Sequence, residues 1–178
     1  MARARTLPRR RWRALLAFAL LALARAGIGA VPTPQEYISG FVLYVHWPDD
    51  TQIGTWQVCA SGPASGGDAH YSGLLVRDRP FAVRHVRGGE SLDGCAILDL
   101  TGSDPTEALV LLKQSQARRS LLTVGNGRDF CSAGGMICLL QEPTRGGFEV
   151  NLSAMRGAGF NINAKLLMLA RPSGGAPP

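Results

Sequence analysis

Four cysteines are the residues of this chain best suited to covalent or metal chemistry. The last two, Cys131 and Cys138, are separated by six residues that include Gly134 and Gly135. Zinc sites favour ligands two to four positions apart and need a second pair, and dithiol oxidoreductases place two residues between their cysteines. The spacing therefore favours a structural disulfide over a regulatory redox switch, and either of these over metal binding or catalysis.

The glycine pair also indicates how the four cysteines are joined. It lets the backbone turn tightly enough to bring Cys131 and Cys138 within bonding distance, and this is the most economical of the three possible pairings. Cys59 then remains for Cys95. Chain-entropy arithmetic gives about 2.5 kcal/mol for the shorter loop and about 3.8 kcal/mol for the longer one. Bonds of this kind persist in oxidising compartments.

The start of the chain indicates that it reaches such a compartment. Six arginines among the first thirteen residues precede an unbroken apolar stretch at residues 14–24, and small residues follow. This stretch is too short for the roughly twenty residues that span a bilayer. The pattern is typical of a secretory signal peptide, cleaved after Ala26 or as late as Ala30. We expect residues 1–26 to be removed on export.

Removal of the leader changes the charge of the protein. The leader holds seven of the nineteen basic residues and none of the thirteen acidic ones, so the mature chain carries twelve basic against thirteen acidic residues. The usual reason to expect nucleic-acid binding by a basic chain therefore disappears. We expect one α/β domain at residues 31–172, a normal size for a single core, and a disordered tail at residues 173–178.

The first predicted helix has a clear start and a clear stop. Thr33 and Glu36 form a capping box around Pro34, which suits the first helical turn. Apolar residues then recur at three- and four-residue spacing. Pro48 disfavours helical geometry at the residue before it, so this pattern predicts a helix that ends at Trp47.

The rest of the domain alternates between strand-like and helical patterns. A second cap-proline-glutamate signature at residues 104–107 starts a helix that continues to Gln116, and a last helix is expected at residues 164–170. One or two helical turns fit residues 70–76. Strands are expected at residues 56–59, 80–85, 95–100, 120–124, 136–140 and 148–152.

This alternation determines the expected fold class. Strand-helix-strand order predicts parallel strands joined by crossover helices, with apolar runs that are buried on both faces of the sheet. The short glycine-containing turn before residue 148 predicts an antiparallel hairpin instead. We therefore expect an α/β three-layer sandwich: a mixed, mostly parallel central sheet flanked by helices, with one C-terminal antiparallel hairpin.

Other candidates for chemistry are weak. His46, His70 and His85 have no metal-binding spacing. The sequence "GPASG" at residues 62–66 superficially resembles a nucleophile elbow, but the serine is one position late and a proline sits inside the turn. We expect a loop there, no catalytic residue and no enzymatic activity.

One glycine-rich segment could hold a ligand. Gly125, Asn126, Gly127 and Arg128 follow a predicted strand, and their backbone amides could bind an anion. The segment lacks a third glycine and a Lys-Ser/Thr pair, so a plain turn is the simpler interpretation. With the strand end near residues 61–67, it is the candidate site of an alternative function, a small-molecule-binding sensor module for a nucleotide or an amino acid.

Four segments together resemble the YfiR-type periplasmic regulators of Gram-negative bacteria. They span residues 35–170, and their order and spacing are more specific than any one of them alone. The segments are "YISGFVLYVHWPDD" (37–50), "RPFAVRHV" (79–86), "LLTVGNGRDFCSAGGMICLL" (121–140) and "FEVNLSAMRGAGFNINAKLLMLA" (148–170).

The resemblance implies a compact, dimeric periplasmic repressor without a cofactor. Such a protein binds the periplasmic portion of an inner-membrane diguanylate cyclase and holds it inactive. Redox or envelope stress, or capture by an outer-membrane lipoprotein, then releases the cyclase, raises cyclic di-GMP and favours biofilm.

The resemblance also bears on the cysteines. Cys131 and Cys138 match the C-terminal disulfide of the family, and Cys59 and Cys95 match the other. The segment after Cys59 departs from the family because it lacks the usual Asp-Pro-Phe. Since the two loops differ in length, we expect reduction of Cys59–Cys95 to loosen a binding face, and Cys131–Cys138 mainly to preserve the fold.

Overall fold

The structure, a computed structural model, describes residues 31–63, 66–141 and 147–171. The expected signal peptide and the expected C-terminal tail lie outside these residues. Within the described ranges, no helix is long and apolar enough to cross a membrane.

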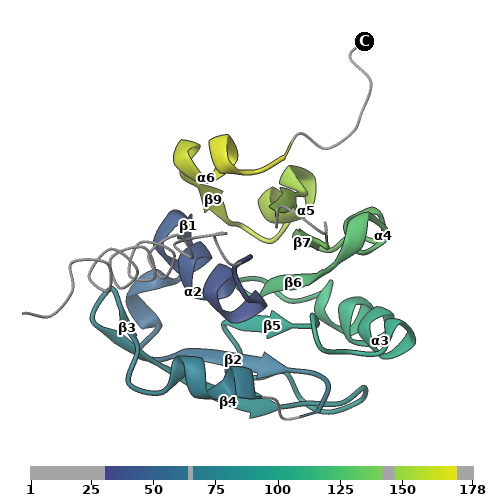
Figure 1. The fold of residues 1–178 in the computed structure, drawn as a ribbon, viewed down its shortest axis with the longest axis horizontal. Helices are drawn as coiled ribbons and strands as arrows, with labels where there is room; N and C mark the ends of the chain where they lie inside the picture. Colours follow the sequence, from purple (N-terminus) through teal and green to yellow (C-terminus); the bar gives the residue numbers. More distant parts are fainter. Residues whose placement is uncertain (1–30, 64–65, 142–146, 172–178) are drawn as a thin grey trace, which may run out of the picture. The chain divides into compact units, whose positions relative to one another are not determined.

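A seven-stranded sheet forms the centre of the fold (Figure 1). Its strand order is β3-β4-β2-β5-β6-β7-β8, and the five inner strands are mutually parallel. The edge strands β3 and β8 are antiparallel to their neighbours. The bounds are β2 Trp56–Ala60, β3 Leu75–Val76, β4 Arg79–His85, β5 Ile97–Asp99, β6 Leu122–Asn126, β7 Ile137–Leu140 and β8 Gly147–Val150. The predicted mixed sheet and its C-terminal hairpin are confirmed.

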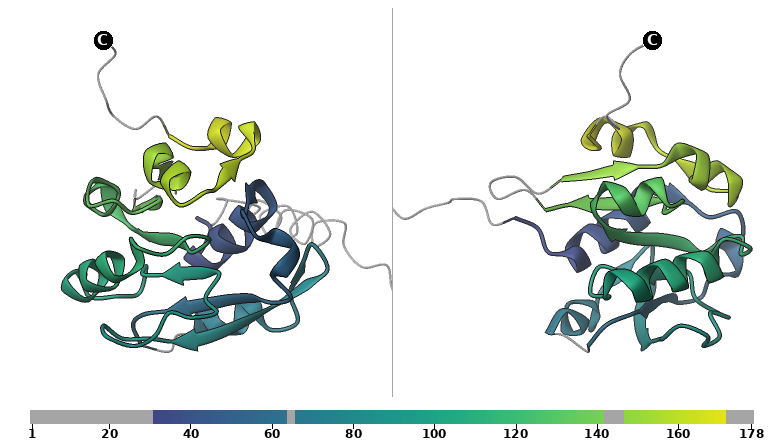
Figure 2. Two further views of the ribbon diagram at one scale, coloured as in Figure 1. Left: turned by 180° about the vertical axis from the view of Figure 1, so that it is seen from behind. Right: turned by 90° about the vertical axis from the view of Figure 1, so that its right-hand side faces the viewer.

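Helices cover both faces of the sheet, as Figure 2 shows from two sides. The predicted start signals are present: Thr33 and Glu36 form a reciprocal capping box, and the Asp104 side chain accepts from the Thr106 amide. The bounds are α2 Pro34–Tyr44, α3 Pro105–Ser115, α4 Gly127–Ser132, α5 Leu152–Gly157 and α6 Ala164–Leu169, with 3-10 turns η2 Asp50–Gln52 and η3 Gly66–Tyr71. The three-layer α/β architecture is therefore confirmed.

The first helix is shorter than predicted. It ends at Tyr44, and the expectation that it continues to Trp47 is wrong. Val45 and His46 instead form strand β1, which pairs antiparallel with β9 (Asn161–Ile162) in a separate two-stranded sheet. Pairing with a segment more than a hundred residues away overrides the local helical periodicity.

Two short helices were not predicted. Helix α4 begins directly after β6, so Gly125 and Asn126 end a strand while Gly127 and Arg128 begin a helix, and the plain-turn interpretation is wrong. Helix α5 follows β8 in the same way. Each contains only six residues, too few to display a helical period in the sequence.

The sheet separates two hydrophobic cores. The first, on the side of α2, contains the aromatic residues Trp47, Trp56 and Phe160, together with residues of α5 and α6. The second lies under α3 and α4 and includes Cys59 and Cys138. We call these the aromatic core and the disulfide core.

Candidate functional site

The strand order reverses once within the parallel part of the sheet. The chain passes from β2 to β4 on one side of β2, and then crosses to β5 on its other side. In open α/β sheets, ligands bind outside the carboxyl ends of the strands at such a reversal. Ala60 and Asp99 are the last residues of β2 and β5, so the expected position is beside these two.

A hollowed surface lies at this position. A larger hollow of about 1080 Å³ extends toward the start of α3, and a smaller one of about 280 Å³ extends toward the start of α2. They adjoin, because both are lined by Ser61, Pro63, His85 and Gly102. We call the two together the switch-point cleft.

Close backbone packing fixes the floor of the cleft. Gly62 has φ +114°, and a Cβ there would lie 2.3 Å from the carbonyl oxygen of Gly102. The Ser61 amide donates to the Asp99 carbonyl at 2.9 Å, and the Ser103 hydroxyl donates to the Ser61 carbonyl at 3.2 Å. Only glycine at position 62 lets the two loops approach this closely.

Asn126, from the predicted ligand segment, braces the same region. Its Nδ2 donates to the carbonyl oxygen of Thr101 at 2.6 Å, which ties the end of β6 to the loop after β5. Arg128 and Gly125, from the same segment, make contacts elsewhere. Arg128 donates from Nε to Oε1 of the buried Glu149 at 2.6 Å, and Gly125 leaves room for the ring of Phe130.

Asp99 places a carboxylate inside the smaller hollow. It is only 5% exposed, and its Oδ1 accepts from the amide and the hydroxyl of Thr101 at 2.9 and 2.7 Å. Burial raises the pKa of Asp99, whereas the Thr101 bonds lower it. The charge of Asp68 also raises this pKa and His85 lowers it, so all three side chains act on the same space.

His85 lines the smaller hollow, and Tyr71 lies within the electrostatic reach of its two carboxylates. His85 Nε2 lies 2.8 Å from Asp68 Oδ2, at the rim of the smaller hollow. Tyr71 is 3% exposed and stacks on Phe81, and in the described part of the chain its hydroxyl has no hydrogen-bond partner. Burial raises the pKa of Tyr71, and the negative charges of Asp99 and Asp68 act in the same direction.

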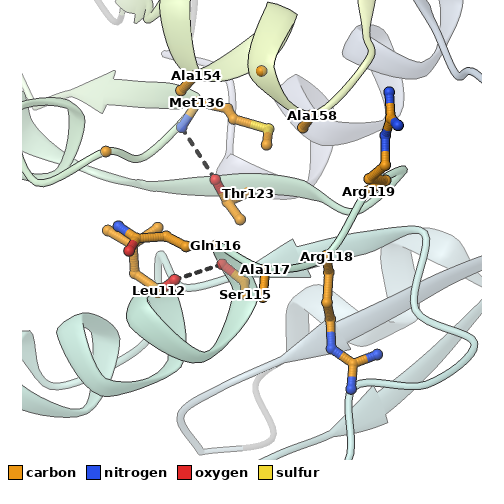
Figure 3. Close-up of a pocket in the computed structure, with 12 residues that line it drawn as sticks. Leu112, Ser115, Gln116, Ala117, Arg118, Arg119, Thr123, Met136, Ala154 and Ala158 are labelled. Atoms are coloured by element: carbon orange, nitrogen blue, oxygen red, sulfur yellow. Dashed lines mark hydrogen bonds between the residues drawn. The ribbon is translucent and has the colours of Figure 1, made fainter.

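A separate hollow of about 280 Å³ lies between the end of α3, β6 and α5 (Figure 3). Two of its hydroxyl groups already have partners: the Ser115 hydroxyl donates to the Leu112 carbonyl at 2.7 Å, and the Thr123 hydroxyl accepts from the Met136 amide at 3.1 Å. Arg118 points away from the hollow in Figure 3 and pairs with Asp93.

The cysteines form two disulfides. Cys59 on β2 bonds Cys95 before β5, and Cys131 on α4 bonds Cys138 on β7, with Cα separations of 5.7 and 5.8 Å. Each pair has one fully buried member, Cys59 or Cys138, and one half-buried member. Both bonds therefore lie in the disulfide core and tie it to the central sheet.

The longer disulfide has a charged neighbour. Arg84 on β4 donates from Nη2 to the sulfur of Cys59 at 3.4 Å and to that of Cys95 at 3.2 Å. Its guanidinium also holds the carbonyls of Ser91 and Asp93. A positive charge beside a sulfur stabilises the thiolate that reduction releases. Sequence analysis missed this residue because nothing local links β4 to the cysteines.

The described residues do not form a metal-binding site. They contain no group of three or more His, Cys, Asp or Glu side chains able to hold a metal ion. The cleft carboxylates are spread over two hollows instead of converging on one point.

The comparison with protein families agrees with this architecture. The sequence model of the family described as YfiR/HmsC-like matches residues 34–171, more than three quarters of the chain. The chain belongs to the YfiR/HmsC-like family. The match runs from the first residue of α2 past the end of α6, so it includes both disulfides and the switch-point cleft. This family consists of periplasmic regulators of diguanylate cyclases, with a regulatory instead of a catalytic domain.

Proposed function

We propose that this protein is a periplasmic negative regulator. It binds the periplasmic sensor portion of one inner-membrane diguanylate cyclase and represses the synthesis of cyclic di-GMP. The observation that carries this proposal is the family match over the whole described unit. The two disulfides support it, because they suit a protein that works in an oxidising compartment.

A repressor of this kind acts by differential binding. It must bind the inhibited state of the cyclase more tightly than the active state, and a signal must change that difference. We propose that reduction of Cys59–Cys95 is one such signal, and that capture by an outer-membrane lipoprotein is a second. Arg84 supports the redox route because its contacts favour the reduced form of this pair.

The two disulfides suit different tasks in this scheme. Cys59–Cys95 closes a loop of 36 residues that includes part of the switch-point cleft, His85 and Glu90 among it. Cys131–Cys138 closes a separation of seven residues and holds α4 on β7. Reduction of Cys59–Cys95 therefore frees a longer segment than reduction of Cys131–Cys138. The longer bond suits a regulatory role, and the shorter one suits a structural role.

The test is genetic and biochemical together. A strain that lacks this protein should contain several-fold more cyclic di-GMP than its parent, and the full-length chain should restore the parental level. The tagged mature protein should also retain one transmembrane cyclase from detergent-solubilised membranes.

Two controls sharpen this test. A chain that begins at residue 27, and therefore lacks the leader, should not complement, since the partner surface is periplasmic. The pair Cys59→Ser and Cys95→Ser should repress less than the parent under oxidising conditions. An unchanged cyclic di-GMP level in the deletion strain, with no cyclase in the retained fraction, would refute the proposal.

A further inference from the structure

The switch-point cleft has a feature that the proposed repression does not require. Two polar side chains that line it, Ser61 and Asp99, are each only 5% exposed. Among the described residues, nothing donates a hydrogen bond to Oδ2 of Asp99, and the Ser61 hydroxyl has no hydrogen-bond partner either. A buried carboxylate without a cation is costly to maintain.

Acidic side chains predominate in the cleft, so a bound cation would offset the cost of burying the Asp99 carboxylate. Asp99 and Asp68 line the smaller hollow. Glu90, Asp104 and Glu107 line the larger one. Among the described residues, Arg87 is the only Lys or Arg that lines either hollow, and His85 lines both.

The carboxylates of the two hollows have different partners. Asp68 and His85 pair with each other beside Asp99. In the larger hollow, Glu107 accepts from the Gly88 amide, and Glu90 accepts from the Arg87 amide at 3.0 Å. The amides hold Glu107 and Glu90 without adding charge, whereas Asp68 pairs with His85 and burial raises the pKa of Asp99. Acidic groups from both hollows therefore face one continuous space.

We propose that the switch-point cleft binds an aliphatic diamine or polyamine. One ammonium group donates to Oδ2 of Asp99 in the smaller hollow, where Ser61 offers a second acceptor. The other ammonium lies among Glu90, Asp104 and Glu107 in the larger hollow, and the hydrocarbon chain crosses beside Pro63. A flexible dication can reach two separated anionic centres, whereas a metal ion needs its ligands at one point.

This ligand site goes beyond the proposed function and does not depend on it. A protein that binds no cyclase could still bind an amine here, and a repressor could act without one. Calorimetry on the purified mature protein therefore tests the inference separately from any assay of cyclic di-GMP.

The experiment is titration calorimetry of the oxidised mature protein with putrescine and spermidine at physiological salt. We expect saturable binding at one site per chain, tighter for spermidine. Butane-1,4-diol, succinate, magnesium and calcium should not bind. Saturable binding of either metal without amine binding, or no binding of either amine up to millimolar concentration, would overturn the inference.

Matched variants locate the site. Asp99→Asn keeps the acceptor that Thr101 uses and should fold, but it should weaken putrescine binding about tenfold or more. Glu107→Gln should weaken spermidine binding in the same direction. Asp129→Asn removes the same charge from an exposed position on α4 and should leave both affinities unchanged. Equal weakening by Asp129→Asn and Asp99→Asn would mean unspecific attraction and reject the site.

Discussion

The two faces of the central sheet are stabilised in different ways. Among the described residues, the aromatic core buries 22, and its rings contact one another closely, with centroid distances of 4.9 Å for Trp47–Trp56 and for Phe41–Phe148. The disulfide core buries 11 of the described residues, and both disulfides lie in it. Apolar burial is thus the main source of stability on one face, while covalent links supplement it on the other.

This difference gives the redox state a local effect. Reduction should leave the packing of the aromatic core intact, because no disulfide lies in that core, while it removes two constraints from the α3 and α4 side. The helices on that side should therefore loosen first, while the sheet and α2 keep their order. A regulator built in this way can change one surface without unfolding.

The largest effect is expected when both disulfides are removed. Substitution of all four cysteines by serine should lower the free energy of unfolding by about 6 kcal/mol in the chain-entropy description. Hydrogen exchange followed by mass spectrometry should show a greater loss of protection in α3 and α4 than in α2 and β8. A greater loss in α2 would invert the comparison of the two faces.

A truncation on the aromatic face should be almost as damaging but insensitive to reductant. Phe41 is 2% exposed and packs on Phe148, so Phe41→Ala should cost about 3–5 kcal/mol. Urea denaturation with and without dithiothreitol measures this. The cost should be similar in both conditions, and a cost that disappears under reduction would mean that the two cores are not independent.

The two disulfides should contribute unequally to the free energy of unfolding. The pair Cys59→Ser and Cys95→Ser should lower the free energy of unfolding by about 3.8 kcal/mol, and the pair Cys131→Ser and Cys138→Ser by about 2.5 kcal/mol. Denaturant midpoints of the two double variants, at equal slope, give this order. The reverse order would indicate that the Cys131–Cys138 bond stabilises α4 by more than the length of its loop predicts.

Arg84 should make the longer disulfide easier to reduce. Arg84→Gln removes the positive charge beside Cys59 and Cys95, so a small thiol should reduce this bond several-fold more slowly. Timed alkylation and mass spectrometry follow both bonds in one sample. The Cys131–Cys138 bond serves as the internal control, and an equal slowing of both bonds would exclude a local effect of Arg84.

The smallest effect concerns Asp99, a carboxyl group buried in the switch-point cleft. Burial raises its pKa in the folded protein, so folding favours the protonated form. Stability should then fall as pH rises from the ordinary value of 3.8 through the raised value. Asp99→Asn should remove this loss, making the variant more stable than the parent at neutral pH but not at low pH. Thermal unfolding across this range tests the sign, and an Asn variant that is less stable at neutral pH contradicts it.

Much of the fold follows from local signals. The capping box at Thr33 and Glu36, the second cap at Asp104 and the glycine-containing sequence before residue 148 each lie within a few residues. Sequence analysis could therefore predict the starts of two helices and the C-terminal hairpin. Strand β1 did not follow, because its residues carry a helical period and become a strand only through pairing with Asn161 and Ile162. Helices α4 and α5 are too short to have a period.

The cleft could be predicted only in part. The strand end near residue 61 was identified, since parallel strands commonly bind ligands at their carboxyl ends. Asp99 was missed because it looks like an ordinary residue at the end of a buried strand. It gains its role when the strand order places it beside Asp68 and His85, which lie elsewhere in the chain. Arg84 was missed for the same reason.

The central claim is that the oxidised protein restrains a cyclase from the periplasmic side. The most direct test is a cyclase reconstituted in membranes with its periplasmic portion accessible, supplied with GTP and assayed for cyclic di-GMP. The account predicts that the oxidised mature protein lowers the rate in a saturable manner, and that the Cys59→Ser and Cys95→Ser variant needs a higher concentration for the same effect. A rate that stays constant in a large excess of the oxidised protein would contradict it.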